Sequence, residues 1–527
     1  MRTTHCHVKI VTPALPGQPS RTFEWSGPEG QNTLHGLTSV EVADSVDGLV
    51  NRFSLQLAPE HFGREDSLAE LVPAYSLVSI DMGAYGRGDD GDTTAMIGLT
   101  SPAVENEQWT PQGPQRGIAI AGRGIESVLA DANVWWAPYL ETHALDESEI
   151  DRFLTAPFLE QLTGQLIWNK KIVGEDTDPR QAILSTLFYY LLNHASATLN
   201  LLLPDEQRIR DLLLPDGYTP ETLDAQLARF PPRPGIDYEM PARWTFIGDA
   251  LGVTKLLLQS ATLHPQPGPV LNMLLSMIDR EFHEFFVRYE RDGGTGTRRA
   301  RIMHRIKPFA GPGLAETLEV IDRTVLGRRP RRSRFNLREP SLETVEITSA
   351  DVLGSQLAHG MADVRNVFFV SPGQSAMFQN DEFKANLAPK FAGHRGDYSY
   401  IGRYGIRPME HVTPHMVIGK AGSTDEGAII EAADKLSELL RVWYDPQPVM
   451  LEGQIRVLGR NAYRAGQRLV WRGEDETGHP DGRPTREFYV RATQKQYDCG
   501  TGAFAATLMV NRGWTIADAP AGTGSRR

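Results

Sequence analysis

Cysteine is scarce in this chain of 527 residues, which contains only Cys6 and Cys499. Two thiols cannot supply the disulfide framework of a small secreted module, so we expect both to behave as small apolar residues. The first residues, MRTTHCHVKIVTPALPG, lack an apolar run long enough for an export signal. Acidic residues outnumber basic ones by 66 to 54, and the resulting net charge of −12 disfavours a diffuse nucleic-acid-binding protein.

The sequence also lacks the common motifs of enzymes. It contains neither a GxxxxGK[ST] phosphate loop nor a G-x-S-x-G elbow that would expose a nucleophilic serine. The string EFHE at 281–284 has no second histidine four residues after the first, so it is not a zincin helix. We therefore expect no catalytic residue, and a protein that is not an enzyme.

Metal ligands do not gather at a suitable spacing either. His5, Cys6 and His7 are adjacent, while His411 and His415 lie on either side of a proline. A zinc site needs three or four converging ligands, and neither group has a second half at a suitable spacing. We expect no metal and no cofactor.

One uncharged stretch, residues 181–203, is long enough to cross a bilayer. It contains several serine, threonine, asparagine and histidine residues, each of which is costly in lipid. We interpret it as a buried helix and expect no membrane span.

The residues that are present indicate a globular protein rich in β-strands. Hydrophobic residues make up 40% and charged residues 23%, as in soluble globular proteins. In NRFSLQLAP, the apolar side chains of Phe53, Leu55 and Leu57 alternate with polar ones, which is typical of a half-buried strand. YSLVSIDMG, AMIGLTS and RGIAIAG follow the same pattern, so we predict a small β-barrel at the start of the chain.

Later segments differ in their periodicity. Helical spacing predominates after about residue 146, HEFFVRYE and RARIMHRIKPF resemble the two strands of a hairpin, and strand patterns return in the last third. Before those last strands, an amphipathic helix is predicted that carries Ile429, Ala432, Leu436, Leu439 and Trp443 on one face. The predicted fold class is α+β, with two small antiparallel β-barrel modules and a large inserted helical domain. The predicted divisions are a first β-barrel module (1–140), a helical insertion (141–280), a β-hairpin and basic connector (281–340), a split second β-barrel module (341–372 and 446–515), a loop-helix excursion (373–445) and a C-terminal tail (516–527).

The basic connector contains the densest run of charge, including Arg328, Arg329, Arg331 and Arg332. Such a run could bind phosphates, with Phe335 stacking on bases, or it could be a solvated link whose arginines pair with acidic neighbours or a partner subunit. We favour the solvated link because acidic residues are abundant throughout the chain.

Several of these segments, taken together, resemble one family. FSLQLAP, LVSIDMG, MIGLTS and IAIAGRGIESVL look like the first barrel of baseplate hub proteins of contractile tails. RIMHRIKPF is similar to the hairpin of that family, and YSYIGRYGIRPMEHVT to the segment before its long helix. GQIRVLGRNAYRAGQRLVW, EFYVRATQKQYDCG and TLMVNRG resemble its closing strands. The family includes late-control D-like tail proteins and is similar to the N-terminal half of type VI secretion spikes.

The resemblance implies a structural hub: a homotrimer whose six barrels form a pseudo-sixfold ring that joins the tail tube to the central spike. Its implied partners are the tail tube protein, the spike protein and baseplate wedge proteins, with transient passage of DNA or a tape-measure protein. Its implied place is the virion tail, assembled in the bacterial host cytoplasm. A phage virion and a bacterial injection machine both remain open. The candidate partner or subunit contacts are Trp135, Trp136, Tyr404, Arg407, Arg328, Arg329, Arg331 and Arg332.

Two other functions remain open at this point. The helical block could be the catalytic domain of a tail-associated hydrolase that degrades peptidoglycan. Alternatively, the arginine run could make the protein a connector that binds nucleic acid.

Overall fold

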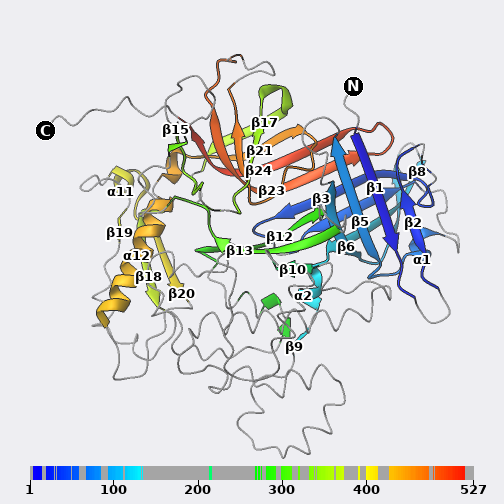
Figure 1. Ribbon diagram of the computed structural model, residues 1–527, viewed down its shortest axis with the longest axis horizontal. Coiled ribbons are helices and arrows are strands. Elements are labelled where there is room, and N and C mark those ends of the chain that lie inside the picture. Colours follow the sequence, from blue (N-terminus) through cyan, green and yellow to red (C-terminus); the bar gives the residue numbers. More distant parts are fainter. Residues whose placement is uncertain are drawn as a thin grey trace, which may run out of the picture.

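The structure is a computed structural model of the chain (Figure 1). The residues it describes are 4–14, 19–28, 30, 32–48, 50–58, 67–84, 93–110, 113–131, 133–134, 213–215, 268–269, 271–272, 275, 280–291, 298–310, 319–320, 331–337, 339, 341–360, 364–372, 390–391, 399–413, 426–444, 446–473, 479 and 481–516.

One mostly antiparallel sheet of 14 strands dominates the described residues. The first third of the chain contributes β1 (Thr4–Val11), β2 (Thr22–Trp25), β3 (Leu37–Ser45), β4 (Arg52–Leu57), β5 (Leu77–Ala84), β6 (Thr94–Thr100), β7 (Val104–Thr110) and β8 (Gly113–Gly124). The last third contributes β16 (Thr344–Ile347), β17 (Val352–His359), β21 (Leu451–Leu458), β22 (Arg468–Trp471), β23 (Arg486–Asp498) and β24 (Phe504–Thr515). The single parallel pair in this sheet joins β16 to β22.

The two ends of the chain meet within this sheet. Strand order runs β17-β21-β24-β23-β3-β4-β8-β6-β5-β1-β2, with β7 beside β8 and with β22 and β16 beside β23. The antiparallel ladder between β23 and β3, from Ala492 opposite Ser45 to Asp498 opposite Ser39, connects the two modules. The sequence predicted two small antiparallel β-barrel modules, and among the described strands the β3–β23 ladder joins the two groups of strands into one sheet. Long-range pairing of this kind leaves no local signature in a sequence.

Alternation of buried and exposed side chains within the strands gives each module its own core. Phe53, Leu55 and Leu57 are buried with the residues between them facing outward, which confirms the strand predicted there. The first core also includes Val8, Ile10, Ile80 and Ile120, and the second is built from Ile455, Val457, Leu469, Phe488 and Leu508.

A hairpin lies against the first module, as its green strands in Figure 1 show. It consists of β12 (His283–Arg291) and β13 (Arg298–Ile306), paired antiparallel over nine residues, which confirms the predicted hairpin. Because side chains alternate along a strand, Phe285, Val287 and Tyr289 enter the first core while Phe286 enters another core on the opposite face. The hairpin therefore packs between two hydrophobic cores. β10 (Leu213–Pro215) runs parallel to β13 at its edge.

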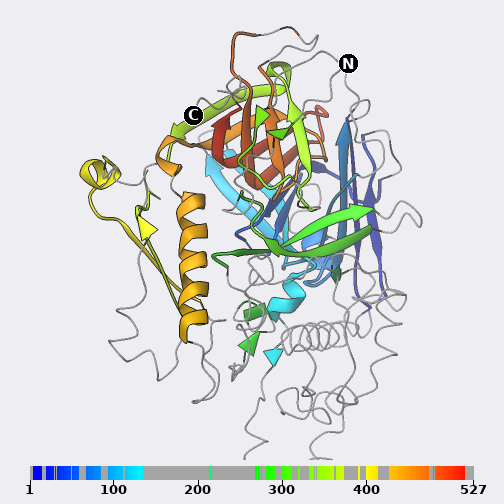
Figure 2. The same ribbon diagram turned by 60° about the vertical axis from the view of Figure 1, so that its left-hand side comes forward.

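The third core surrounds the helix α12 (Glu426–Tyr444). Leu436, Leu439 and Trp443 are buried along one side of it, as the sequence predicted. The helix packs on a small sheet made of β18 (Val367–Pro372), β19 (Lys390–Phe391) and β20 (Pro408–Thr413), and lies between that sheet and the main body (Figure 2). β18 and β20 are parallel.

The remaining elements are short: α1 (Leu68–Leu71), α2 (Ser127–Asp131), β9 (Asn133–Val134), β11 (Gly268–Pro269), β14 (Glu319–Val320), β15 (Arg331–Arg332), η5 (Ser349–Asp351), α11 (Ser399–Tyr404) and η7 (Gln447–Val449). Of the described helices, none combines the length and apolar character required to cross a bilayer.

The predicted helical insertion lies almost entirely outside the described residues. Where the structure describes residues 141–280, it shows the two short strands β10 and β11 and helical backbone at 271, 272 and 275. The described fold is therefore mostly antiparallel β-sheet, and the helical domain remains a prediction. The divisions at residues 140, 280 and 340 also remain predictions, because each is bordered by undescribed residues.

Candidate functional site

A buried network of charges connects the hairpin to the second module. Glu284 of β12 faces Arg305 of β13, with 2.9 Å between Oε2 and Nε. Arg305 also donates hydrogen bonds to the carbonyl oxygens of Ser341 and Gly466, while the hydroxyl of Tyr489 donates to Glu284. Burial disfavours the charge on Arg305, but the carboxylate of Glu284 raises its pKa above the usual value. The network positions β12 and β13 against strand β23.

A second guanidinium extends this network. Arg288 of β12 donates to the same two carbonyl oxygens and lies 3.3 Å from a carboxylate oxygen of Glu343. Burial, together with the nearby Arg305, lowers the pKa of Arg288 to about 10. The guanidinium carbons of both arginines lie 5.2 to 5.5 Å from the centre of the Phe286 ring. Such stacking on an aromatic face partly compensates for the loss of hydration.

The other end of the hairpin is bonded to the first module. Glu126 accepts hydrogen bonds from the Asn51 backbone N–H and from the Tyr289 hydroxyl, each at 2.7 Å. Burial raises the pKa of Glu126 to about 7. Arg298 donates from Nε to both carboxylate oxygens of Asp81 on β5. Burial opposes ionisation of Asp81, but hydrogen bonds from His7 and Arg298 lower its pKa to about 2.

The hairpin thus carries polar contacts to both modules, and these contacts are largely buried. A buried charge that loses its partner is strongly destabilising, so the pairs oppose relative movement of the parts they join. We identify this junction as the first candidate functional feature of the chain.

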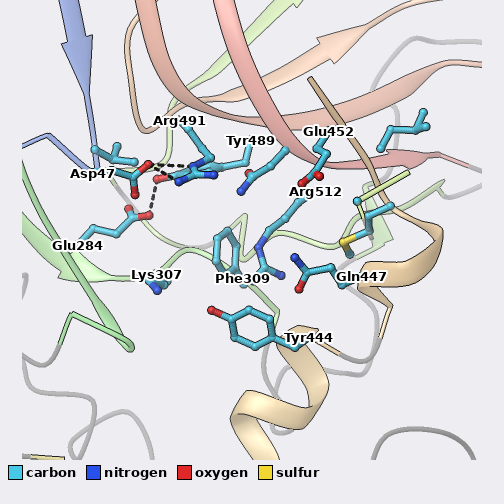
Figure 3. A pocket seen from close by; sticks show the side chains of 15 residues that line it. Asp47, Glu284, Lys307, Phe309, Tyr444, Gln447, Glu452, Tyr489, Arg491 and Arg512 are labelled. Atoms are coloured by element: carbon cyan, nitrogen blue, oxygen red, sulfur yellow. Dashed lines mark hydrogen bonds and ion pairs between the residues drawn. The ribbon is translucent and has the colours of Figure 1, made fainter. Parts of the chain in front are cut away.

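A cavity of about 160 Å³ lies at the same junction (Figure 3). Residues from every neighbouring part line it: Val46 and Asp47 after β3; Glu284, Lys307 and Phe309 of the hairpin region; Tyr444, Gln447 and Met450 near the end of α12; and Gly360, Leu451, Glu452, Tyr489, Arg491, Asn511 and Arg512 of the second module. At its rim, Arg491 donates from Nε to a carboxylate oxygen of Asp47 at 2.8 Å. Lys307 and Tyr444 both contact Glu281.

The candidate metal ligands of the sequence do not form a site among the described residues. There, no cluster of three or more His, Cys, Asp and Glu side chains could hold a metal ion. Cys6 is buried in the first core, while Nδ1 of His7 lies 3.6 Å from Asp81. His411 packs edge-on against the ring of Phe282, and His415 lies outside the described residues.

Two predicted contact residues lie together at the edge of the small sheet. Tyr404 ends α11, and its carbonyl oxygen accepts a hydrogen bond from Nε of Arg407. The amide side chain of Asn366, which is fully buried, bonds to the backbone of Gly405 and Arg407. Between them Ile406 is 72% exposed, so the segment presents an apolar side chain on a fixed turn.

The other predicted contacts are not brought together. Trp135, Trp136, Arg328 and Arg329 lie outside the described residues, and the structure gives only the backbone strand β15 for Arg331 and Arg332. These six remain predictions.

Phe335, in contrast, is not available to stack on bases. The side chain is fully buried and stacks on Tyr489, with ring centres 6.2 Å apart. Ser333 donates a hydrogen bond to buried Glu487, and the guanidinium of Arg334 lies over Trp514 at 4.3 Å. The interpretation of Phe335 as an exposed base-stacking residue is therefore wrong, because an aromatic residue in a basic connector can still belong to a core.

The sequence reasoning missed the junction network. It considered Glu284 only as part of a metal motif and did not single out Arg288 or Arg305. A signal was present, because charged residues alternate with aromatic and aliphatic ones in both strands of the predicted hairpin. Charges at inward positions of a strand indicate buried pairs.

No protein-family model matches the chain, and no curated protein matches it. Several solved structures are similar. The tail protein of Neisseria meningitidis MC58 is 11% identical, with 96% of each chain covered and a TM-score of 0.37. The 43 kDa tail protein of prophage MuSo2 from Shewanella oneidensis is also 11% identical, with 96% of this chain and 97% of that chain covered and a TM-score of 0.41.

A type VI secretion component is similar as well. The E. coli c3393 protein, itself described as similar to the T4 bacteriophage tail proteins gp27 and gp5, is 8% identical, with 92% of this chain and 77% of that chain covered and a TM-score of 0.33.

Proposed function

We propose that the chain is the structural hub of a contractile-tail baseplate, in which three copies form a ring that joins the tail tube to the central spike. The observation that carries the proposal is the pairing of β3 with β23, which makes two sheet modules of one chain into a single unit. Three such units present six modules around a threefold axis. A ring of this kind can meet a sixfold tube on one side and a threefold spike on the other.

The ends of the sheet support association between copies. Among the described residues, β17 pairs only with β21, so its other edge is open. All of its side chains are exposed or half-buried, and its sequence VLGSQLAH contains no Lys, Arg, Asp, Glu or Pro. Proteins commonly protect a free edge with charged residues or proline, and β17 has neither. A covering strand from a neighbouring copy would satisfy this edge.

A branch of the sheet beside β8 offers a different surface. β7 pairs only with β8 among the described strands, and its Trp109 is 76% exposed. Contact between two unlike edges of identical copies is heterologous, and such contacts close into a ring when the rotation permits. Exposed tryptophans are common anchors of interfaces. A contact between β17 of one copy and β7 of the next would support a closed ring, which the proposed trimer requires.

Further parts of the proposal follow from the resemblance. The partners would be the tail tube protein, the spike protein and baseplate wedge proteins, with DNA or a tape-measure protein passing through the ring. The protein would act without catalysis in a tail assembled in the host cytoplasm. Incubation with purified peptidoglycan tests this point, since release of soluble fragments would favour a hydrolase.

Native mass spectrometry of the full chain tests the hub proposal directly. We expect a species of three times 58.5 kDa, with a ring of six similar densities in cryo-electron microscopy. Leu353→Lys, on exposed β17, should shift the population to folded monomers. Val449→Lys, at a similarly exposed residue outside the sheet, is the matched control and should remain trimeric. A monomeric wild-type protein, alone and with its spike, would contradict the hub.

A further inference from the structure

Arg512 adopts an unusual backbone conformation for a residue inside a β-strand. Its φ is 52°, in the left-handed region that non-glycine residues seldom adopt. The register of β24 shifts on both sides nearby, between Leu451 and Gly453 of β21 and between Glu487 and Tyr489 of β23. A bulge of this kind redirects a side chain, and strained backbone is often found at functional sites. Here it directs the Arg512 side chain into the cavity of Figure 3.

The guanidinium of Arg512 is held by aromatic rings and one carbonyl group. Nη1 donates to the carbonyl oxygen of Trp443 in the last turn of α12, at 2.6 Å. The central carbon lies 3.7 Å from the centre of the Phe309 ring and 5.2 Å from that of Tyr444. Burial lowers the pKa of Arg512. Glu281 and Glu284 act in the opposite direction, although neither forms an ion pair with Arg512.

Three buried arginines of the described residues have a carboxylate partner, whereas Arg512 is half-buried. Arg305 pairs with Glu284 at 2.9 Å, Arg468 pairs with Glu487 at 2.8 Å, and Arg288 lies 3.3 Å from a carboxylate. Among the described residues, Arg512 has no carboxylate oxygen within ion-pair distance. A charge removed from water without a counter-ion is costly, so the vacant position beside Arg512 favours an anion.

Two amide side chains at the cavity have unused hydrogen-bonding capacity. The side-chain oxygens of Gln447 and Asn511 are buried and lack a hydrogen-bond partner. The oxygen and nitrogen of an amide exchange places by a half-turn, so either group can present N–H donors to a ligand. Both residues are neighbours of Arg512 in the cavity lining.

The remaining charges of the lining are already engaged or lie elsewhere. Asp47 pairs with Arg491, and Lys307 lies 3.6 Å from Glu281. The carboxylate of Glu452 lies against Gly360. The lining contains three acidic and three basic side chains, and Arg512 is the base among them without an ion-pair partner in the described part of the chain. The cavity therefore lacks the cluster of free cations that an anion of high charge would need. A singly charged, planar anion fits this environment best.

We propose that this cavity binds a carboxylate group, which pairs with the free edge of the Arg512 guanidinium and accepts hydrogen bonds from the amides of Gln447 and Asn511. A planar carboxylate matches the fork of N–H donors on a guanidinium. The carboxylate belongs either to a small organic acid or to an acidic side chain or C-terminus of a bound polypeptide. This inference rests on the cavity alone and is independent of the hub proposal.

Ligand-observed NMR of the full chain tests the site. Saturation transfer from the protein to acetate should be saturable and should weaken at least about tenfold in Arg512→Gln. Arg116→Gln, on β8 and paired with Glu107 outside the cavity lining, is the matched control and should bind acetate as the wild type does. A capped peptide containing one Asp, compared with its Asn counterpart, examines the polypeptide source.

Each outcome either supports the proposed carboxylate site or contradicts it. Acetate binding that requires Arg512 indicates a small acid, whereas binding of the Asp peptide alone indicates a polypeptide carboxylate. Binding of neither, or equal binding by Arg512→Gln, overturns the proposal. If Arg512→Gln fails to fold, Gln447→Leu replaces it, because that side chain lies outside the ion pair. Binding by Gln447→Leu should then be several-fold weaker, and unchanged binding would contradict the proposed site.

Discussion

Glu284 and Arg305 face each other across the two strands of the β12–β13 hairpin, and both side chains are at least 95% buried. Replacing Glu284 with Gln would leave the buried guanidinium of Arg305 without its counter-ion. We expect the free energy of unfolding to fall by about 3–5 kcal/mol. Denaturation by guanidinium chloride, followed by tryptophan fluorescence, measures the change.

An exposed ion pair supplies the control for this prediction. Arg491 and Asp47 are about half-exposed, and their interaction is screened by water. Asp47→Asn should therefore change stability by only about 0–1 kcal/mol. Equal losses in Glu284→Gln and Asp47→Asn would show that the buried pair does not hold the junction together.

Because of Glu126, we expect the free energy of unfolding to fall as the pH rises from about 5 to about 7. Burial raises the pKa of its carboxyl from 4.5 to about 7, so the folded state keeps a proton that the unfolded state has released. The folded state therefore binds more protons between about pH 5 and pH 7, and stability falls as the pH rises through this range. The loss attributable to Glu126 is on the order of 3 kcal/mol.

Thermal unfolding at several pH values isolates this contribution. In Glu126→Gln the side chain stays neutral, so the melting temperature should fall less between pH 5 and pH 8 than in the wild type. Glu107→Gln, on the edge strand β7, should retain the wild-type slope. Parallel curves for the wild type and Glu126→Gln would contradict the buried, proton-binding carboxyl.

The sequence predicted the strands, the hairpin and α12 because their patterns are local. Alternation of Phe53, Leu55 and Leu57, or the helical spacing of Leu436 and Leu439, is visible within a few residues and depends on one buried face. The structure confirms these elements with little change in their extent. In each of these elements, the spacing of apolar residues along the sequence already shows which face is buried.

The parts that could not be predicted depend on residues far apart in the chain. The ladder of β23 with β3 joins residues more than 440 positions apart. Nothing in the local sequence of either strand indicates that the other strand is its partner. The cavity at Arg512 forms where the hairpin region, the end of α12 and β24 come together. No spacing of residues in the sequence predicts that these distant segments are neighbours. The bulge that turns Arg512 inward has no signal beyond the Arg-Gly pair at 512–513.

Gly453 of β21 lies where a side chain would collide with the neighbouring strand. Its φ is +147°, and a Cβ atom there would approach the carbonyl oxygen of Gln356 on β17 to 2.0 Å. Gly453→Ala should weaken the β17–β21 pairing and cost about 2 kcal/mol or more. Gly354→Ala, on β17 itself with open space around it, should change stability by less than about 1 kcal/mol.

Limited proteolysis and the melting temperature measure the difference in stability between Gly453→Ala and Gly354→Ala. Faster cleavage within residues 352–359 is expected in Gly453→Ala and not in Gly354→Ala. If both variants resist cleavage equally, the close approach of the two strands at Gly453 is not required. Loss of trimers in Gly453→Ala alone would further connect this pairing to assembly.

Cys6 and Cys499 are both buried and are not bonded to each other. Burial raises the pKa of Cys499 to about 12 and that of Cys6 well above its usual value. Because the thiolate is the reactive form, Cys499 should react with Ellman's reagent on the order of 10³-fold more slowly in the native protein than in the unfolded chain. Two equivalents of thiol should appear on unfolding, and one in Cys6→Ala. Rapid native labelling would mean that the core around β1 and the end of β23 opens readily, and would weaken the view of the β3–β23 seam as a rigid joint.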